Sequence, residues 1–172
     1  MSRWAAILPL LALALLVALF ARFSLRHSPQ VTPMAMVGKL APDPVLRPLN
    51  GGSPKPLRAA AQRGPILINF FASWCAPCAA EAPALMALKA EGVPIVAVDY
   101  KDHPADASDF LARYGDPYEA VFADPQGRVG IDFGITGVPE TFVVDAAGVI
   151  RGKEAQPISA ADAEGLLQKA ER

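Results

Sequence analysis

The chain has 172 residues, with 16 Lys and Arg against 17 Asp and Glu, so its net charge is −1. This length has room for one domain with its own hydrophobic core and for one additional segment. Lys and Arg are not clustered, which excludes the basic surface that nucleic-acid-binding domains need.

The additional segment is an apolar run at the N-terminus. No charged residue occurs from Trp4 to Phe20, which is the short end of the about 17–25 residues that cross a bilayer as a helix. A cleaved signal peptide is the alternative, but no small-x-small cleavage site follows the run. We therefore expect residues 1–26 to be an uncleaved, single-pass membrane anchor with a short cytoplasmic start.

The charges beside the run do not settle its orientation. Arg22, Arg26 and His27 follow it, whereas Arg3 precedes it. The positive-inside rule taken alone therefore favours a cytoplasmic location for the rest of the chain.

After the anchor, we expect a Pro- and Gly-rich linker at residues 27–40 and one domain at residues 41–172. The domain should begin with a short strand or hairpin that turns at Asn50-Gly51-Gly52. Composition and periodicity then predict buried strands at 65–72 and 94–100, shorter strands at 119–123, 141–145 and 149–152, and helices at 76–91, 105–114 and from a cap at Ser159 to about Lys169. This order predicts an α/β sandwich with a mixed central sheet.

Cys75 and Cys78 are the two cysteines of the chain. A disulfide between them closes a very small loop, so it removes little entropy from the unfolded chain and is a poor structural staple. A zinc site needs about four ligands, and His27 and His103 lie far from the pair in the sequence. Ala79 stands where the C-x-x-C-H haem-attachment motif has histidine. Copper binding by the two thiolates remains open, although we expect no cofactor or metal.

The position of the pair favours redox chemistry. It follows a buried strand and opens a helix, where free backbone N–H groups and the helix dipole stabilise a thiolate on Cys75. Cys78 lies one turn further into the helix and should be more shielded. An exposed attacking thiolate with a buried resolving partner is what thiol–disulfide exchange requires.

With these residues in place, the chain resembles thioredoxin-fold proteins, and in particular the membrane-anchored periplasmic thioredoxins of cytochrome c maturation, the CcmG/DsbE type. The resemblance covers roughly residues 41–150, and residues 152–158 depart from the family pattern. It is carried by Trp74-Cys75-Ala76-Pro77-Cys78, Pro83, Gly137-Val138-Pro139-Glu140-Thr141-Phe142, Asn69, Glu81, Tyr100-Lys101-Asp102, Gly115-Asp116-Pro117-Tyr118 and Asp132-Phe133-Gly134.

The resemblance implies how substrate is bound. Pro139 should form a cis peptide bond facing the cysteines, and the backbone of Val138 should pair with a substrate chain as a short added strand. Trp74, Ala76 and Pro77 should contact the substrate, although core packing is an equally good explanation of Trp74.

The resemblance also implies two acids near the cysteines. The position that holds a buried carboxylate in general thioredoxins is Asn69 here, which cannot titrate. Glu81 and Glu140 should serve instead, partly buried, with raised pKa values that allow proton transfer near neutral pH. On spacing alone, Glu81 would be a solvated first-turn helix residue. Lys101, Asp102 and His103 are expected to form a solvated polar loop.

The partners are implied by the resemblance as well. It implies that the chain reduces C-x-x-C-H disulfides of apocytochrome c before haem attachment and is itself re-reduced by a membrane thiol reductase. Ala76, Ala79 and Ala80 surround the pair without adding a cation, which favours a mild reductant over an oxidant. A reductant of this kind is needed in the periplasm, so this chemistry favours the periplasmic face of a bacterial inner membrane. A broader-specificity anchored reductase and a copper-binding module are the alternatives.

Overall fold

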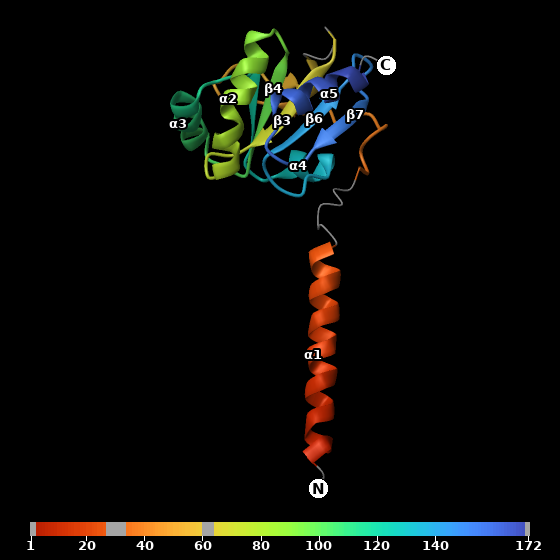
Figure 1. Ribbon diagram of the computed structural model, residues 1–172. Helices are drawn as coiled ribbons and strands as arrows, with labels where there is room; N and C mark the ends of the chain where they lie inside the picture. The colour runs from red at the N-terminus through yellow and green to blue at the C-terminus, as the bar shows by residue number, and fades with distance from the viewer. Residues whose placement is uncertain (1–2, 27–33, 60–63, 171–172) are drawn as a thin grey trace. The chain divides into compact units, whose positions relative to one another are not determined.

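A computed structural model describes residues 3–26, 34–59 and 64–170, with side chains in the first of these ranges described for residues 8–22. The chain forms two compact units, Met1–Thr32 and Pro33–Arg172. Helix α1 (Arg3–Arg26) is the described part of the first unit (Figure 1). Over the described residues, no helix has both the length and the apolar character needed to cross a membrane. The predictions for His27 and for linker residues 27–33 lie outside the described residues.

The second unit is built on a five-stranded sheet with the strand order β5-β4-β3-β6-β7. Its strands are β3 (Ile66–Phe71), β4 (Ile95–Tyr100), β5 (Ala120–Asp124), β6 (Glu140–Val144) and β7 (Ile150–Glu154). β3, β4 and β5 are parallel, whereas β6 runs antiparallel to both β3 and β7. The predicted mixed sheet is confirmed, and each predicted core strand lies within two residues of an observed one.

Helices cover both faces of this sheet (Figure 1). They are α2 (Ala76–Ala90), α3 (Pro104–Tyr114), α4 (Arg128–Phe133) and α5 (Ala160–Ala170). Because strand side chains alternate, Leu67 and Phe71 of β3 share one core cluster with α2, α3 and α5. Ile68 and Phe70 share the other with α4. We call these the α2 face and the α4 face; both cysteines belong to the α2 face.

The residues before β3 run along both outer strands of the sheet. Leu40 bridges Val149 next to β7, and the N–H of Ala41 donates to the carbonyl of Gly148 at 2.8 Å. At the opposite edge, the N–H of Leu49 donates to the carbonyl of Val121 in β5 at 2.7 Å. Residues 34–40, which we predicted to be part of the linker, therefore belong to the same compact unit as the domain.

Leu49 lies in the loop of a small hairpin. Its strands β1 (Val45–Leu46) and β2 (Lys55–Pro56) pair antiparallel. The predicted turn is present, with Gly51 and Gly52 at φ 82° and 106°, conformations that glycine adopts without steric cost.

Helix α4 was not predicted. It has only six residues and begins and ends at glycines in the left-handed conformation, Gly127 and Gly134. A glycine-rich stretch of this length reads as a loop. Its N-terminus is fixed from outside, because the Asp124 carboxylate accepts hydrogen bonds from the N–H groups of Arg128 and Gly130 at 2.8 and 3.0 Å.

Candidate active site

Cys75 and Cys78 form a disulfide at the start of α2. Cys75 is the N-cap residue, with an extended backbone, and its Sγ accepts a hydrogen bond from the N–H of Cys78 at 3.1 Å. An N-cap acceptor satisfies one of the free N–H groups of the first helical turn, at the positive end of the helix dipole. The Sγ of Cys75 therefore occupies the position where a negative charge is best stabilised.

The cysteines are equally buried in this oxidised state. Cys75 is 3% exposed and Cys78 is 2% exposed. The prediction that Cys75 is exposed is wrong for the disulfide form, because the bond to Cys78 holds its Sγ against the first turn of α2.

Trp74, directly before Cys75, is 60% exposed. The core-packing explanation is thereby wrong, and the indole is available at the surface beside the cysteines. Its Nε1–H donates to the carbonyl of Lys101 at 3.3 Å, which ties the ring to the loop after β4. Ala76 and Pro77 are also exposed, so three of the predicted substrate-contacting residues lie at the surface.

The loop at residues 101–103 is only partly the solvated loop that we predicted. Lys101 and His103 are exposed, but Asp102 is buried. Its carboxylate accepts hydrogen bonds from the N–H of Ser73 at 2.5 Å and from the N–H of His103 at 2.8 Å. Asp102 therefore holds the chain two residues before Cys75.

Glu81 is the buried acid of α2, 2% exposed and three residues after Cys78. Its Oε1 accepts from Nδ2 of Asn69, and its Oε2 accepts from the N–H of Ile158, each at 3.0 Å. The solvated alternative is therefore wrong. Burial raises the pKa of Glu81 from 4.5 to about 7, and the hydrogen bonds from Ile158 and Asn69 lower it in part. A group with this pKa exchanges protons at neutral pH.

Asn69 is the centre of the polar cluster around Glu81. Besides Glu81, its Nδ2 donates to Oγ1 of Thr141 at 3.0 Å, and its Oδ1 accepts from the Tyr118 hydroxyl at 2.8 Å. Burial, and next the charge of Glu81, raise the pKa of Tyr118 well above its ordinary value. The Asn69 amide therefore orients the Glu81 carboxylate through a hydrogen bond. It does not itself take up or release a proton, unlike the carboxylate at this position in general thioredoxins.

Glu140 is buried as predicted, 1% exposed, but on the other side of the sheet. Thr141 bonds to Asn69 on the α2 face, so by strand alternation Glu140 points to the α4 face with Phe142. The prediction that Glu140 lies beside the cysteines is not what the structure shows, because a strand residue faces opposite to its neighbour.

The carboxylate of Glu140 holds the segment that leads to Pro139. Its Oε1 accepts from both the N–H and the hydroxyl of Thr136, at 2.8 and 2.5 Å. Its Oε2 lies 2.7 Å from Nζ of Lys153, and both side chains are almost fully buried. The contact between Glu140 and Lys153 is an ion pair without the angles of a hydrogen bond. Among the described residues, Oε2 of Glu140 has no partner that meets hydrogen-bond geometry.

The Val138–Pro139 peptide bond is cis, as predicted. Val138 is half-buried and packs against both core clusters, one of which contains the two cysteines. The loop before β6 is therefore anchored in the same core as the start of α2.

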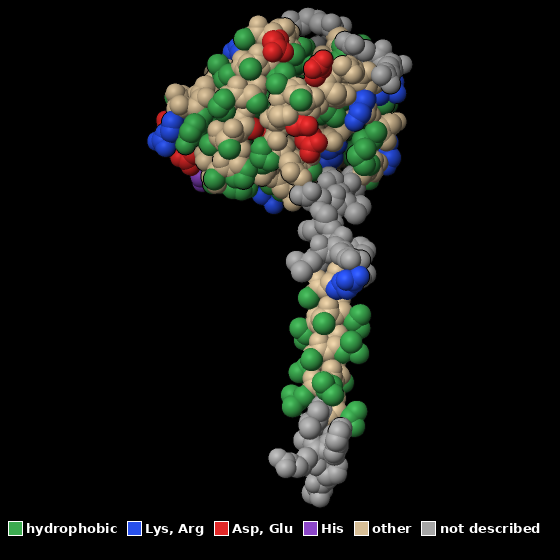
Figure 2. Space-filling model, in the orientation of Figure 1, with side chains coloured by type: hydrophobic (Ala, Val, Ile, Leu, Met, Phe, Trp, Pro, Cys, Tyr) green, Lys and Arg blue, Asp and Glu red, His purple; other side chains and the backbone are tan. Residues whose placement is uncertain are grey.

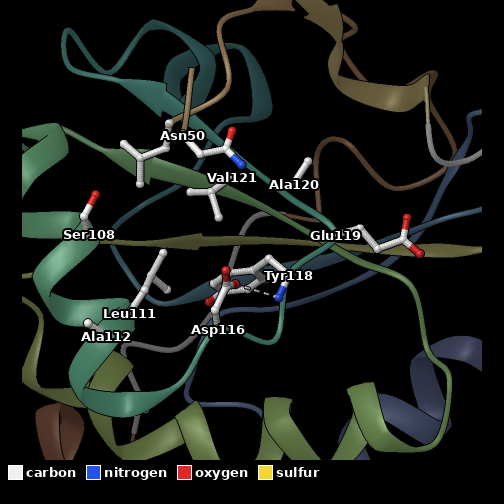
Figure 3. A pocket seen from close by; sticks show the side chains of 10 residues that line it. Asn50, Ser108, Leu111, Ala112, Asp116, Tyr118, Glu119, Ala120 and Val121 are labelled. Atoms are coloured by element: carbon white, nitrogen blue, oxygen red, sulfur yellow. Dashed lines mark hydrogen bonds between the residues drawn. The ribbon is translucent and has the colours of Figure 1, made fainter. Parts of the chain in front are cut away.

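A hollow lies elsewhere, beside β5 (Figure 3). It has a volume of about 450 Å³, and Tyr118, Leu111 and Asp116 are among the residues that line it. Neither a cysteine nor any other predicted site residue lines it. Tyr118 links it to the polar cluster, since the Tyr118 hydroxyl donates to Asn69, but no predicted site residue lines the hollow and it is not the redox centre.

Sequence reasoning missed the contributions of Asp102, Tyr118, Thr141 and Lys153. Their contacts join segments distant in sequence, such as Asn69 and Thr141, which are 72 positions apart, and local patterns do not reveal them. A signal existed for one further acid, Asp99, which stands inside the apolar run 94–100 and is completely buried.

Comparisons with known proteins agree with this site. The redoxin family matches residues 36–167. The thiol:disulfide interchange protein HelX of Rhodobacter capsulatus is 46% identical over 154 residues, which cover 88% of this chain and 86% of HelX. The DsbE homolog of Paracoccus denitrificans, also a thiol:disulfide interchange protein, is 43% identical over 83% of each chain.

A solved structure shows the same fold. The thiol:disulfide interchange protein of the thioredoxin family from Chlorobium tepidum has a TM-score of 0.63 and 28% identity, covering 76% of this chain and 94% of its own. Family match, close relatives and the Cys75–Cys78 disulfide lead to one conclusion. The chain belongs to the redoxin family, with a thioredoxin-like fold, and its relatives are thiol:disulfide interchange proteins.

Proposed function

We propose that this protein is a thiol–disulfide oxidoreductase that reduces the C-x-x-C-H disulfide of apocytochrome c before haem attachment. The observation that carries the proposal is the position of Cys75 Sγ, which caps the N-terminus of α2. A thiolate there is stabilised and can attack a disulfide. Support comes from relatives named thiol:disulfide interchange proteins, among them CycY of Rhizobium leguminosarum at 45% identity over 103 residues.

The reaction runs in two exchanges. In the first, the Cys75 thiolate attacks one sulfur of the substrate disulfide, and the other substrate sulfur leaves as a thiolate that takes a proton. In the second, the Cys78 thiolate attacks Cys75 Sγ and releases the remaining substrate sulfur. The substrate gains two electrons and two protons, and the protein is left with the disulfide observed here.

Glu81 serves the second exchange as the proton acceptor for Cys78. Cys78 is buried, which disfavours its thiolate. Glu81 lies one turn further along α2, on the same side of the helix. Because its pKa is about 7, an ionised fraction is available at neutral pH.

Substrate binds between the start of α2 and the loop before β6. The backbone of Val138 pairs with the substrate chain, and Trp74, Ala76 and Pro77 make apolar contacts with it. Glu140 acts at a distance in this scheme. Through Thr136 and Lys153 it holds the loop that carries Val138 and Pro139.

The pair acts as a mild reductant and is regenerated by a membrane thiol reductase. Ala76, Ala79 and Ala80 add no positive charge around the cysteines, and strongly oxidising pairs depend on extra stabilisation of their thiolate. In the oxidising periplasm, a reductant stays reduced only with such a dedicated electron supply.

The location that suits this chemistry is the periplasmic face of a bacterial inner membrane. Residues 1–26 would form a single-pass anchor, residues 27–40 a linker and residues 41–172 the catalytic domain. The anchor is supported by the uncharged run from Trp4 to Phe20 and by the exposed apolar side chains along α1 (Figure 2). A reporter fused after Arg172 should be active only in the periplasm; activity in the cytoplasm overturns this orientation.

A covalent trap tests the function. A Cys78→Ser variant lacks the resolving thiol, so its substrate should remain bound to Cys75 as a mixed disulfide. We expect apocytochrome c as the main adduct in a host with its own cytochromes, and no adduct in the matched Cys75→Ser variant. A broad set of secreted proteins instead indicates a general reductase, and the absence of adducts rejects the proposal.

A further inference from the structure

Asp99 is a buried carboxyl group that the proposed reaction does not use. It lies near the end of β4, is 0% exposed, and neither carboxyl oxygen has a hydrogen-bond partner by geometry among the described residues. It pairs in register with Phe71, the last residue of β3 before the cysteine loop. Buried polar groups are nearly always satisfied, so an unsatisfied one calls for an explanation.

Within the described part of the chain, the charged groups that act on Asp99 are acidic. Asp102 comes from the loop after β4, Asp106 from the first turn of α3, and Asp124 from the end of β5. Burial, and next the negative charge of Asp102, raise the pKa of Asp99 from 3.8 to about 8. At neutral pH Asp99 is therefore mostly protonated, and a protonated carboxyl has an O–H to donate.

Asp102 is the acceptor for that proton, because a hydrogen bond between the two side chains is among the causes that raise the pKa of Asp99. Two ionised carboxylates cannot make such a bond, since neither has a proton to donate. Asp102 also holds the segment before Cys75. One of its oxygens accepts from the N–H of Ser73 and the other from the N–H of His103. Its neighbour Lys101 accepts from the Trp74 indole and has φ 51°, an uncommon conformation for a residue other than glycine. Loop 101–103 thus holds both residues that precede Cys75.

We propose that Asp99 is a positioning residue, whose carboxyl proton is shared with Asp102 and keeps Asp102 turned toward Ser73, so that Trp74 and Cys75 stay in place. Release of this proton to solvent leaves two adjacent buried carboxylates, which repel each other. The contact between Asp102 and Ser73 then weakens, and the Trp74 ring loses its fixed position. The inference rests on the proposed function in one respect, namely that Cys75 is the reactive residue whose position matters.

The test follows Ser73 and Trp74 in the oxidised full-length protein across about pH 6 to 10. A Trp4→Phe background leaves Trp74 as the fluorescent indole, and hydrogen exchange reports the Ser73 N–H directly. We expect a fluorescence transition centred near the pKa of Asp99, about 8. The protection factor of the Ser73 N–H should fall about tenfold across this pH transition. A tenfold change corresponds to one pKa unit of interaction between ionisation of Asp99 and the Ser73 contact.

Two variants identify the titrating group. Asp99→Asn keeps a donor for Asp102 but cannot titrate, so both transitions should disappear. Asp109→Asn removes an exposed acid of α3 and should leave both transitions unchanged. Transitions that persist in Asp99→Asn, or a wild-type protein without any, overturn the inference.

A third variant keeps the proposal testable if Asp99→Asn does not fold. Asp102→Asn leaves no second carboxylate for an ionised Asp99 to repel, so the Ser73 and Trp74 transitions should disappear in this variant as well. Transitions of wild-type size in Asp102→Asn are contrary to the inference. None of these measurements involves a substrate, so a failure of the trapping experiment leaves their outcome intact.

Discussion

Ile158 donates its backbone N–H to Oε2 of Glu81 across 77 residues of sequence, at 3.0 Å. Ile158 ends the stretch 152–158, which we expected to depart from the family pattern, and it is buried beside α2. This stretch supplies one of the two hydrogen bonds that limit the rise in the Glu81 pKa.

Glu81→Gln should slow the second exchange of the reaction. Gln keeps the shape of Glu81 but cannot accept a proton from Cys78, and loss of a general base costs on the order of 100-fold or more in rate. The rate of thiol release from a C-x-x-C-H peptide disulfide, measured in single turnover, should also lose its inflection near pH 7. Glu91→Gln, an exposed change at the end of α2, is the control. Equal rates for both variants would falsify the role of Glu81.

The free energy of unfolding should fall as the pH rises from about 5 to about 8. Folding raises the pKa values of Glu81 and Asp99, so the folded protein keeps protons that the unfolded chain has already released. This stabilisation is complete below the unfolded pKa values and is lost as the pH passes the folded ones. Urea unfolding of the oxidised protein should show the slope, and Glu81→Gln and Asp99→Asn should each flatten it. A stability that increases over this range is incompatible with these shifts.

Lys153→Met should be strongly destabilising, because it leaves Glu140 buried without its counter-charge. Breaking a buried ion pair from one side costs about 3–5 kcal/mol. Arg151→Met is a matched control on the same strand: its partner is Asp145, but the Arg151 side chain is 43% exposed, and exposed pairs contribute about 0–1 kcal/mol. Urea titration of both variants measures the difference.

Adding Glu140→Met to Lys153→Met should recover part of this loss, since no unpaired charge then remains. The double variant should nevertheless reduce substrate more slowly than the wild type, because Thr136 has lost its acceptor and the loop carrying Val138 is less well held. Wild-type rates in the double variant would show that Glu140 has no positioning role.

Tyr118→Phe should lower stability by about 1–2 kcal/mol, because Oδ1 of Asn69 loses its donor inside the core. The ring packing on Phe71, with centroids 5.4 Å apart, is retained in Phe. Tyr114→Phe changes an exposed tyrosine of α3 and should have no measurable effect. Thermal unfolding of the two variants, side by side, is sufficient, and equal melting temperatures would contradict the cluster around Asn69.

The sequence was sufficient for the features that rest on local chemistry. A buried strand followed by Cys75 and a helix predicts a capped, reactive sulfur, and the family resemblance predicted the cis bond at Pro139. Features that depend on which side of a strand faces which layer were not accessible. Glu140 and Thr141 are neighbours, and only the partner of Thr141 shows which of them points toward the cysteines. Asp102 looked solvated because its partner, Ser73, lies 29 residues earlier.

The two short pairings made by the residues before β3 have a consequence for how the domain meets other chains. Leu40 and Ala41 run beside the β7 side of the sheet, and Leu49 runs beside β5. Open strand edges recruit other polypeptides indiscriminately, which leads to aggregation. Where these edges are covered, the substrate pairing that we propose for the backbone of Val138 has less competition from the strand edges. A chain shortened to begin after Ala41 would lose the residues that cover the sheet beside β7. It should therefore self-associate, even though its cysteines and the residues around them are unchanged.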